Sequence, residues 1–385
     1  MATVIADDIS APGTHALVIG VSAYRHLTGG AQPTQAGIDT GMEQLRSAAR
    51  SASDVAQWLQ TRPYRSPLPP LRSLRVLLSP GADEQIAEAY RGLDQLAATR
   101  AQVEAALAGF WRACCSHRDN HAVVYVAGHG IQLSKTGALL LLEDFASPDR
   151  LQLLSGALDL AGIHRAFNSD GAPRHQFWFV DACRQIPAVA RQFENLLSGA
   201  LSLDIKNAGS AESSMLLLSA ITGTSAYGLP GGRSLFAEAL LQTLHDGAAA
   251  EGPDGQALEH WHVPVTRLLA TLPRRVSEAA RLLEREQSVE AAGMPLPAVF
   301  HVYPETPRAE FTVSLQPDAA AASSQLIVRD EALEPVPTSA EWPSTAVVDA
   351  GLYQVEVQTA APYRPYKKLV NVKPPMTPHT ARVTP

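Results

Sequence analysis

Short apolar segments rich in β-branched residues alternate along most of this chain with longer segments that have helical periodicity. This alternation is typical of a largely parallel sheet that helices cover on both faces. We expect six strands, at 15–22, 74–79, 122–127, 176–181, 214–220 and 298–303. We expect helices at 43–61, 99–115, 157–167, 234–244 and 263–286. The sequence therefore predicts an α/β fold with a mostly parallel six-stranded sheet flanked by helices.

The composition changes after Tyr303. Six prolines interrupt the next forty residues, and four segments there alternate or are rich in β-branched residues, at 310–315, 325–329, 351–358 and 367–372. Proline is confined to the edges and ends of strands, so this pattern favours a small all-β domain. We expect an N-terminal extension at 1–13, an α/β domain at 14–304, a small β-sandwich domain at 305–373 and a loose tail at 374–385.

Composition and charge exclude several classes of protein. The chain has 385 residues, of which 46% are hydrophobic and 18% charged, so it folds into two or three domains and is not disordered. Its net charge of −7 without a basic cluster disfavours nucleic acid and anionic lipid as partners. No apolar run is long enough to span a membrane, and the acidic N-terminus does not resemble a secretory signal. Three cysteines without a Cys-x-x-Cys pair indicate neither a disulfide framework nor a zinc site, and we expect a cytoplasmic location.

Two predicted strands end in residues that can do chemistry. The strand at 122–127 leads into Gly-His-Gly, with His129 between the glycines, and the strand at 176–181 leads into Cys183. In a parallel sheet the carboxyl ends of all strands meet at one edge, where open α/β proteins build their sites. His121 and His175 lie at the opposite, amino ends of the same strands. The topology therefore predicts that His129 and Cys183 face each other.

An imidazole beside a thiol can take its proton and generate a nucleophilic thiolate for acyl transfer. The two residues are 54 positions apart in the sequence. We interpret His129 and Cys183 as a catalytic dyad. The alternative is that Cys183 is a small core residue and His129 a hydrogen-bonded residue of the turn.

These motifs resemble those of the caspase-like cysteine peptidase superfamily, in particular the bacterial metacaspases and orthocaspases. The resemblance covers most of 14–304 and is carried by Gly20–Tyr24, Ser53–Val55, Ala98–Arg100, Gly128–Gly130, Leu139–Asp144, Asp181–Arg184 and Gly232–Leu240. Animal caspases have Gln in place of Asp181, and many metacaspases have Ser or Gly where this chain has Arg184 and Gln185. The segment Gly351–Val357, with Pro365–Tyr366 before another strand, looks like a PEGA-type β module.

The resemblance implies the roles of the site residues. Cys183 would attack the scissile carbonyl, His129 would act as general acid and base, and the backbone N–H groups of Gly130 and Cys183 would form the oxyanion hole. No metal or other cofactor takes part in bond cleavage in this family. Some metacaspases need calcium for activation, but this chain has no Asp-rich loop of the EF-hand kind, so calcium dependence stays open.

The resemblance also implies a primary substrate pocket. In metacaspases that cut after Arg or Lys, two aspartates line this pocket, and they correspond here to Asp54 and Asp181. Two carboxylates complement a cationic side chain and repel an acidic one. The alternatives are that Asp54 caps or solvates a helix that begins at Ser53, and that Asp181 is bonded to backbone in the turn.

The sequence thus predicts a cysteine endopeptidase that acts on polypeptides. One alternative is a catalytically silent caspase-like scaffold whose β module binds a partner, and another is a hydrolase or acyltransferase of the same fold with a non-peptide substrate. The resemblance further implies a role in bacterial regulated cell death or phage defence, such as cleavage of a gasdermin-like pore former. Self-cleavage is expected after Arg191 or Lys206, in the linker at 187–213, and the oligomeric state stays open.

Overall fold

The computed structural model describes residues 3–33, 42–92, 96–132, 138–148, 153–169, 171–184, 200–201, 213–221, 223–229, 231–253, 258–294 and 298–385. The chain divides into two compact units, one made of 1–241 and 268–300 and the other of 242–267 and 301–385. The sequence placed its main boundary near residue 305, whereas the second unit also takes in 242–267.

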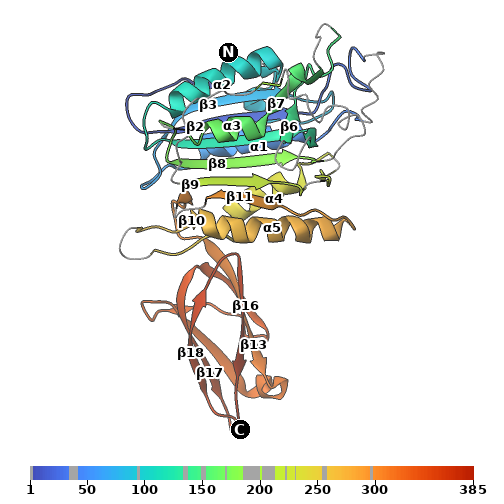
Figure 1. The fold of residues 1–385 in the computed structure, drawn as a ribbon. Helices are drawn as coiled ribbons and strands as arrows, with labels where there is room; N and C mark the ends of the chain where they lie inside the picture. Colours follow the sequence, from blue (N-terminus) through green and yellow to red (C-terminus); the bar gives the residue numbers. More distant parts are fainter. Residues whose placement is uncertain are drawn as a thin grey trace. The chain divides into compact units, whose positions relative to one another are not determined.

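The first unit is built around a seven-stranded sheet with the order β1-β3-β2-β4-β8-β9-β11 (Figure 1). Its strands are β1 (Thr3–Ile5), β2 (Thr14–Val21), β3 (Leu71–Ser79), β4 (His121–Gly128), β8 (His175–Ala182), β9 (Ser213–Leu218) and β11 (Glu290–Met294). The five central strands are parallel, and the edge strands β1 and β11 are antiparallel to their neighbours. The predicted α/β class with a mostly parallel sheet is confirmed.

The membership of the sheet differs from the prediction at both edges. The sixth expected strand forms β12 (Val299–Val302), which pairs with β10 (His262–Pro264) in a separate two-stranded sheet. An apolar run indicates that a segment is buried, but it does not indicate which sheet a strand joins. The edge position belongs to β11, whose sequence EAAGM contains no β-branched residue and so carries no strand signal. Within the expected N-terminal extension, β1 adds the other edge strand.

Helices cover both faces of this sheet. They are α1 (Ala48–Thr61), α2 (Arg100–Cys114), α3 (Leu160–Ala166), α4 (Leu235–His245) and α5 (Val265–Leu282). Figure 1 shows α3 in front of the strands and α1 behind them. Among the helices of the described residues, none combines the length and apolarity needed to span a bilayer.

Side-chain oxygens from outside the helices accept hydrogen bonds from the first N–H groups of α1 and α2. The Ser22 hydroxyl, just past β2, accepts hydrogen bonds from the first two N–H groups of α1, at 3.1 and 3.0 Å. The predicted start of α2 at Thr99 is correct, but Thr99 makes no side-chain capping bond. Instead Asp144 Oδ1 accepts from the Arg100 N–H at 2.9 Å, so a carboxylate distant in sequence bonds to the first N–H group of the helix.

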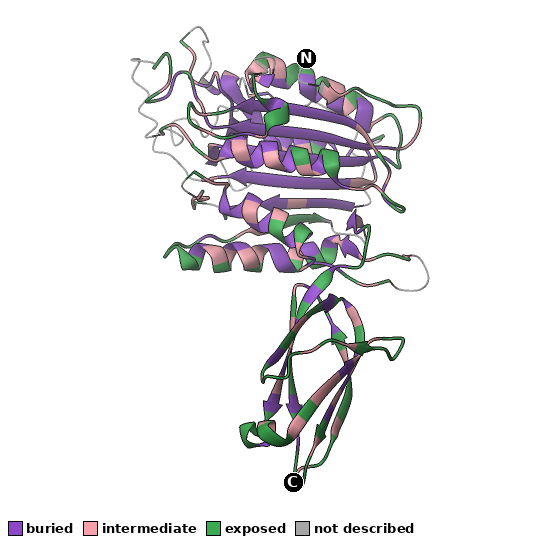
Figure 2. Cartoon of the chain, turned by 180° about the vertical axis from the view of Figure 1, so that it is seen from behind, coloured by how far each residue is buried: buried purple, intermediate pink, exposed green. Residues whose placement is uncertain are grey.

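The core of the first unit lies on both sides of the central strands. All eight residues of β2 and all eight of β4 are buried, as are seven of the eight in β8. In Figure 2 these strands form a continuous buried layer, while the outer sides of the helices are more exposed. Burial on both faces explains why these strands are continuous apolar runs, the pattern that made them predictable. Beyond β4, a small antiparallel sheet combines β5 (Gly130–Gln132), β6 (Ala138–Leu141) and β7 (Ala157–Asp159).

The C-terminal part of the second unit is all-β, as predicted. One sheet has the order β16-β13-β19 and the other the order β15-β14-β17-β18. The strands are β13 (Arg308–Gln316), β14 (Ser324–Arg329), β15 (Pro335–Val336), β16 (Ser344–Asp349), β17 (Gly351–Thr359), β18 (Tyr366–Val372) and β19 (Met376–Arg382). Buried residues of both sheets form one apolar cluster that includes Phe311, Val355 and Val372.

The tail expected at 374–385 is not loose. Residues 376–382 form β19, which pairs in parallel with β13 from Met376 opposite Glu310 to Arg382 opposite Gln316. The sequence MTPHTAR has no apolar alternation, because its strand is held by ladder hydrogen bonds beside β13 and buries few side chains.

A buried arginine joins α1 to the end of the first unit. The Arg62 guanidinium lies over three aromatic rings, 4.7 Å from the centroid of Trp58, 4.6 Å from that of Tyr64 and 5.1 Å from that of Phe300. It also donates to the Phe300 carbonyl at 2.8 Å, and only 6% of the residue is exposed. A desolvated cation between aromatic faces is strongly held, although burial lowers its pKa.

We predict that Arg62→Met lowers the free energy of unfolding by about 2 kcal/mol, because the cation–π contacts are lost and a buried carbonyl loses its donor. Urea unfolding followed by tryptophan fluorescence measures the change. Arg112→Met, at an exposed position in the last turn of α2, is the matched control. Equal midpoints for the two variants would contradict the prediction.

Candidate active site

The pairing of β4 with β8 sets the positions of His129 and Cys183. The two strands are parallel and in register to their ends, with Ala127 opposite Asp181 and Gly128 opposite Ala182. His129 and Cys183 are the next residues on the two chains, and both strands end at the same edge of the sheet. The structure therefore brings the two predicted side chains to adjacent strand ends.

Gly130 allows these two strand ends to approach closely. A Cβ atom on Gly130 would lie 2.1 Å from the carbonyl oxygen of Cys183 and 3.0 Å from the Cβ of Ala182. The first of these is a backbone atom that cannot rotate away. Glycine is required here by space, and its absent side chain leaves the backbone of Gly130 directly against that of Cys183.

The His129 imidazole is oriented by a backbone carbonyl. Its Nε2 lies 2.6 Å from the carbonyl oxygen of Glu43, in the segment that precedes α1. A carbonyl oxygen only accepts hydrogen bonds, so Nε2 carries the proton and Nδ1 of a neutral ring is the basic atom. On another side, the buried Tyr24 ring lies against the imidazole, with centroids 4.9 Å apart.

Burial favours the neutral forms of both side chains. It lowers the pKa of His129, an effect that the bond to the Glu43 carbonyl partly opposes. It raises the pKa of the Cys183 thiol, and the charge of Asp181 acts in the same direction while the Ala226 amide opposes it. Among the described residues no hydrogen bond joins the imidazole to the thiol. The resting site therefore holds a neutral imidazole and a thiol, and catalytic hydrogen bonds often tighten only when substrate is bound.

The backbone of the segment 223–229 contacts Cys183. The Ala226 N–H lies 3.3 Å from the Cys183 sulfur, and the Ala226 carbonyl lies 3.6 Å from it. The next amide, of Tyr227, donates to the buried Gln287 side chain at 3.0 Å. This segment therefore lies beside the sulfur and makes hydrogen bonds to it in the resting state.

Arg184, the residue after Cys183, is bonded to two neighbouring elements. Its Nε donates to Gln132 Oε1 at 2.8 Å, and its guanidinium pairs with Glu290 on β11. Gln132 is two residues after Gly130, so the Arg184 side chain connects the residue after Cys183 to the strand that begins at Gly130. The sequence comparison treated Arg184 only as a departure from the metacaspase pattern. The structure gives it a packing function, since only 5% of the residue is exposed.

The two candidate pocket aspartates contact neighbouring residues of one dipeptide. Asp54 Oδ2 pairs with Arg233 Nε at 2.6 Å. Asp181 Oδ2 accepts from the hydroxyl of Ser234 and, at 2.7 Å, from that of Tyr125. The structure thus brings both carboxylates to the start of α4, one paired with a cation and the other bonded to hydroxyl groups.

The contacts of the two aspartates differ from the alternatives of a helix cap at Asp54 and of bonds to turn backbone at Asp181. Asp54 lies inside α1, which begins at Ala48, so it does not cap a helix that starts at Ser53. Asp181 bonds to side-chain hydroxyls in place of turn backbone, and it is 5% exposed. Burial raises the pKa of Asp181, whereas the hydroxyl donors oppose the rise.

Sequence patterns did not indicate several residues that shape this site. Glu43 acts through its carbonyl, which every residue possesses, so no side-chain pattern marks it. Arg233 and Ser234 lie inside the motif Gly232–Leu240. Their contacts with Asp54 and Asp181, however, join elements that are far apart in the chain. The expected self-cleavage positions Arg191 and Lys206 lie outside the described residues. Within the described ranges, no group of three or more His, Cys, Asp or Glu side chains is arranged to hold a metal ion.

We predict that Cys183 is a slowly alkylated thiol. Its raised pKa leaves less thiolate at neutral pH than an ordinary cysteine has, so its alkylation should rise with pH through a midpoint above the ordinary value of about 8.5. Iodoacetamide labelling between pH 6 and 11, read for each cysteine by peptide mass spectrometry, measures this. Cys115, whose pKa burial raises to about 11, and the denatured chain are the references. A midpoint well below 8 would indicate a resting thiolate–imidazolium pair and contradict the prediction.

Comparisons with known proteins identify the family of this chain. Residues 14–295 match the family described as the caspase domain. A probable protease of a Desulfuromonadales bacterium is 30% identical over 148 residues, which make up 37% of this chain and only 16% of that protein. The crystal structure of caspase-1 from Spodoptera frugiperda aligns with a TM-score of 0.42 at 11% identity, covering 75% of this chain and 89% of that one. Because the family match extends over most of this chain, the chain belongs to the caspase domain family.

Proposed function

We propose that this protein is a cysteine endopeptidase that cleaves polypeptides through an acyl-enzyme. The observation that carries the proposal is the arrangement at the paired ends of β4 and β8. Cys183 follows the end of β8 and His129 follows the end of the adjacent β4, and the Glu43 carbonyl holds the Nε2 proton of His129, so that Nδ1 is the basic atom. Membership of the caspase domain family supports the same reaction class.

In the proposed reaction the thiol proton of Cys183 passes to His129 Nδ1 as the sulfur forms a bond to the scissile carbonyl carbon. The backbone N–H groups of Gly130 and Cys183 stabilise the resulting oxyanion. The C–N bond then breaks, and His129 returns the proton to the leaving amine. A water molecule next gives a proton to His129 and attacks the thioester carbonyl carbon. The C–S bond then breaks, the acid product leaves, and His129 returns the proton to the Cys183 sulfur, which restores the thiol.

We further propose that the enzyme cuts after Arg or Lys. Asp54 contacts Arg233 and Asp181 contacts Ser234, the next residue, which supports a shared acidic site. Asp181 carries the larger part of the selectivity in this proposal, because its bonds are to neutral hydroxyls and its charge is not paired. Asp54 already pairs with Arg233, so a substrate cation competes with that guanidinium for it.

We also propose a cellular role, and it rests on the resemblance to the bacterial metacaspases and orthocaspases. A bacterial, cytoplasmic enzyme of this type would act in regulated cell death or phage defence, with a gasdermin-like pore former as one class of substrate. Incubation of the enzyme with such a protein and analysis of the products by mass spectrometry would test this part of the proposal separately from the peptidase activity.

Cys183→Ala and His129→Ala should each abolish peptide cleavage, since one removes the nucleophile and the other the base. We expect both variants to keep the circular dichroism spectrum of the wild type. An acyl-directed peptide probe should label wild-type Cys183 and should not label the Cys183→Ala variant. Cys115→Ala, which removes a thiol from the end of α2, is the control that should cleave normally. Cleavage by Cys183→Ala near the wild-type rate would exclude this dyad. A wild type that neither cleaves nor takes up the probe would favour the silent scaffold.

Asp181→Asn should reduce kcat/KM more than tenfold on Arg or Lys substrates and less on neutral ones. Loss of one partner from a desolvated charge pair costs about 2–5 kcal/mol, and about 1.4 kcal/mol corresponds to tenfold. Profiling on a peptide library measures the preference. Asp119→Asn, at an exposed position on the opposite edge of the sheet, is the control. Equal losses on all substrates would mean that Asp181 only supports the Cys183 turn. A wild-type preference for acidic or apolar residues before the cut would contradict the basic pocket.

A further inference from the structure

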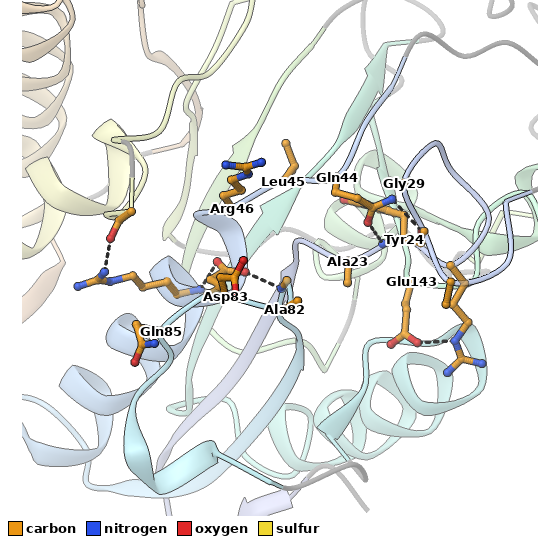
Figure 3. A pocket seen from close by; sticks show the side chains of 17 residues that line it. Ala23, Tyr24, Gly29, Gln44, Leu45, Arg46, Ala82, Asp83, Gln85 and Glu143 are labelled. Carbon is orange, nitrogen blue, oxygen red and sulfur yellow. Dashed lines mark hydrogen bonds and ion pairs between the residues drawn. The ribbon is translucent and has the colours of Figure 1, made fainter.

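We propose that Gln44 is a positioning residue for His129, because its side-chain amide fixes the segment whose carbonyl holds the imidazole. The inference rests on the proposed function and extends it to a residue whose hydrogen bonds, among the described residues, are to Tyr24 and Thr28 and not to His129 or Cys183. Gln44 lines a cavity of about 640 Å³ together with Tyr24 and Leu45, shown in Figure 3.

The Gln44 amide makes three hydrogen bonds to backbone on the loop that follows β2. Its Oε1 accepts from the Tyr24 N–H at 2.7 Å, and its Nε2 donates to the Tyr24 carbonyl at 3.0 Å. The same Nε2 donates to the Thr28 carbonyl at 3.0 Å. Figure 3 shows Gln44 directly beside Tyr24. One side chain therefore pairs with both backbone groups of Tyr24, as a neighbouring strand would do.

Tyr24, the residue that Gln44 holds, contacts His129 in two ways. Its hydroxyl accepts from the His129 backbone N–H at 2.7 Å and donates to the Val21 carbonyl at 3.1 Å. Its ring also lies against the imidazole, and the residue is fully buried. A shift of the Tyr24 loop would therefore move both the backbone and the ring of His129.

The residues on either side of Gln44, Glu43 and Leu45, also make hydrogen bonds through their backbone. The Glu43 carbonyl accepts from His129 Nε2 at 2.6 Å, and the Leu45 N–H donates to the Ser22 carbonyl at 2.9 Å. Three consecutive residues are thus bonded to the loop after β2 or to the histidine. Because the Glu43 carbonyl is one peptide bond from Gln44, its distance from the imidazole depends on how firmly Gln44 is held.

The chemistry of the contacts explains why the residue is glutamine. Only a neutral amide side chain offers an acceptor and two donor hydrogens at the same end. Glutamate would keep the bond from the Tyr24 N–H and lose both bonds to carbonyl oxygens. Asparagine is one methylene shorter and cannot reach the same three groups. Without this amide the Glu43 carbonyl is no longer fixed, and the imidazole loses the partner that selects the Nε2–H tautomer.

Two readouts test the proposal in the full-length protein. The variants are Gln44→Met, which keeps the side-chain length without hydrogen bonds, and Gln44→Glu, which keeps the volume and one bond. Gln85→Met is the matched control, because Gln85 lines the same cavity and is exposed. Steady-state kinetics on a peptide substrate give kcat and KM. Long-range ¹H–¹⁵N NMR of histidine-labelled protein gives the tautomer of His129, with its signals assigned by their loss in His129→Gln.

We expect kcat to fall about tenfold to a hundredfold in both Gln44 variants while KM changes by less than about twofold, because small displacements of a catalytic group have effects of this size. The His129 signals should show a single Nε2–H tautomer in the wild type and in Gln85→Met, and a mixture in the Gln44 variants. Gln44→Glu keeps the proposal testable if Gln44→Met does not fold.

A wild-type tautomer pattern in a folded Gln44 variant would overturn the proposal, as would a rise in KM with unchanged kcat, which indicates substrate contact. The NMR measurement needs no turnover. A tautomer change in a protein that cleaves no peptide would therefore support the positioning role and contradict only the proposed function.

Discussion

The in-register parallel pairing of β4 with β8 is the constraint on which the candidate site depends. Because the two strands pair residue by residue to Gly128 and Ala182, the chain leaves the sheet at the same level on both. His129 and Cys183 come next, and no loop of variable length separates either of them from the sheet. The close approach of Gly130 to the Cys183 carbonyl is possible only because that position lacks a side chain. A buried sheet of this kind resists displacement, since both faces are packed.

The His129 imidazole is hydrogen-bonded to a neutral carbonyl, and the neutrality of this partner affects the pKa of the ring. Burial disfavours the charged ring and lowers its pKa, while a hydrogen bond to a carbonyl stabilises the protonated ring only modestly. A carboxylate in the same place would favour the imidazolium much more strongly. With the Glu43 carbonyl, His129 keeps a fixed tautomer and burial favours its neutral form, which suits its proposed role of first accepting a proton. Orientation and basicity are thus set by different features of the site, one by the carbonyl and the other by burial.

Continuous apolar runs predicted the central strands well, because β2, β4 and β8 are buried on both faces. The edges were harder to predict. The strand β11 has no β-branched residue, and β19 is held mainly by its backbone, so neither has a sequence signature. The positions of His129 and Cys183 followed from topology, since residues at strand ends are placed by the sheet itself. The carbonyl of Glu43 did not, because a backbone group has no sequence signal and its position depends on tertiary contacts such as those of Gln44.

The two candidate pocket aspartates show why residue type alone does not define an electrostatic site. Asp54 and Arg233 together contribute little net charge, because the carboxylate is already paired. Asp181 is desolvated at a cost that raises its pKa, and its bonds to Ser234 and Tyr125 offset this cost without adding a positive charge. Because Arg233 and Ser234 are consecutive, a displacement of this dipeptide would change the partners of both carboxylates.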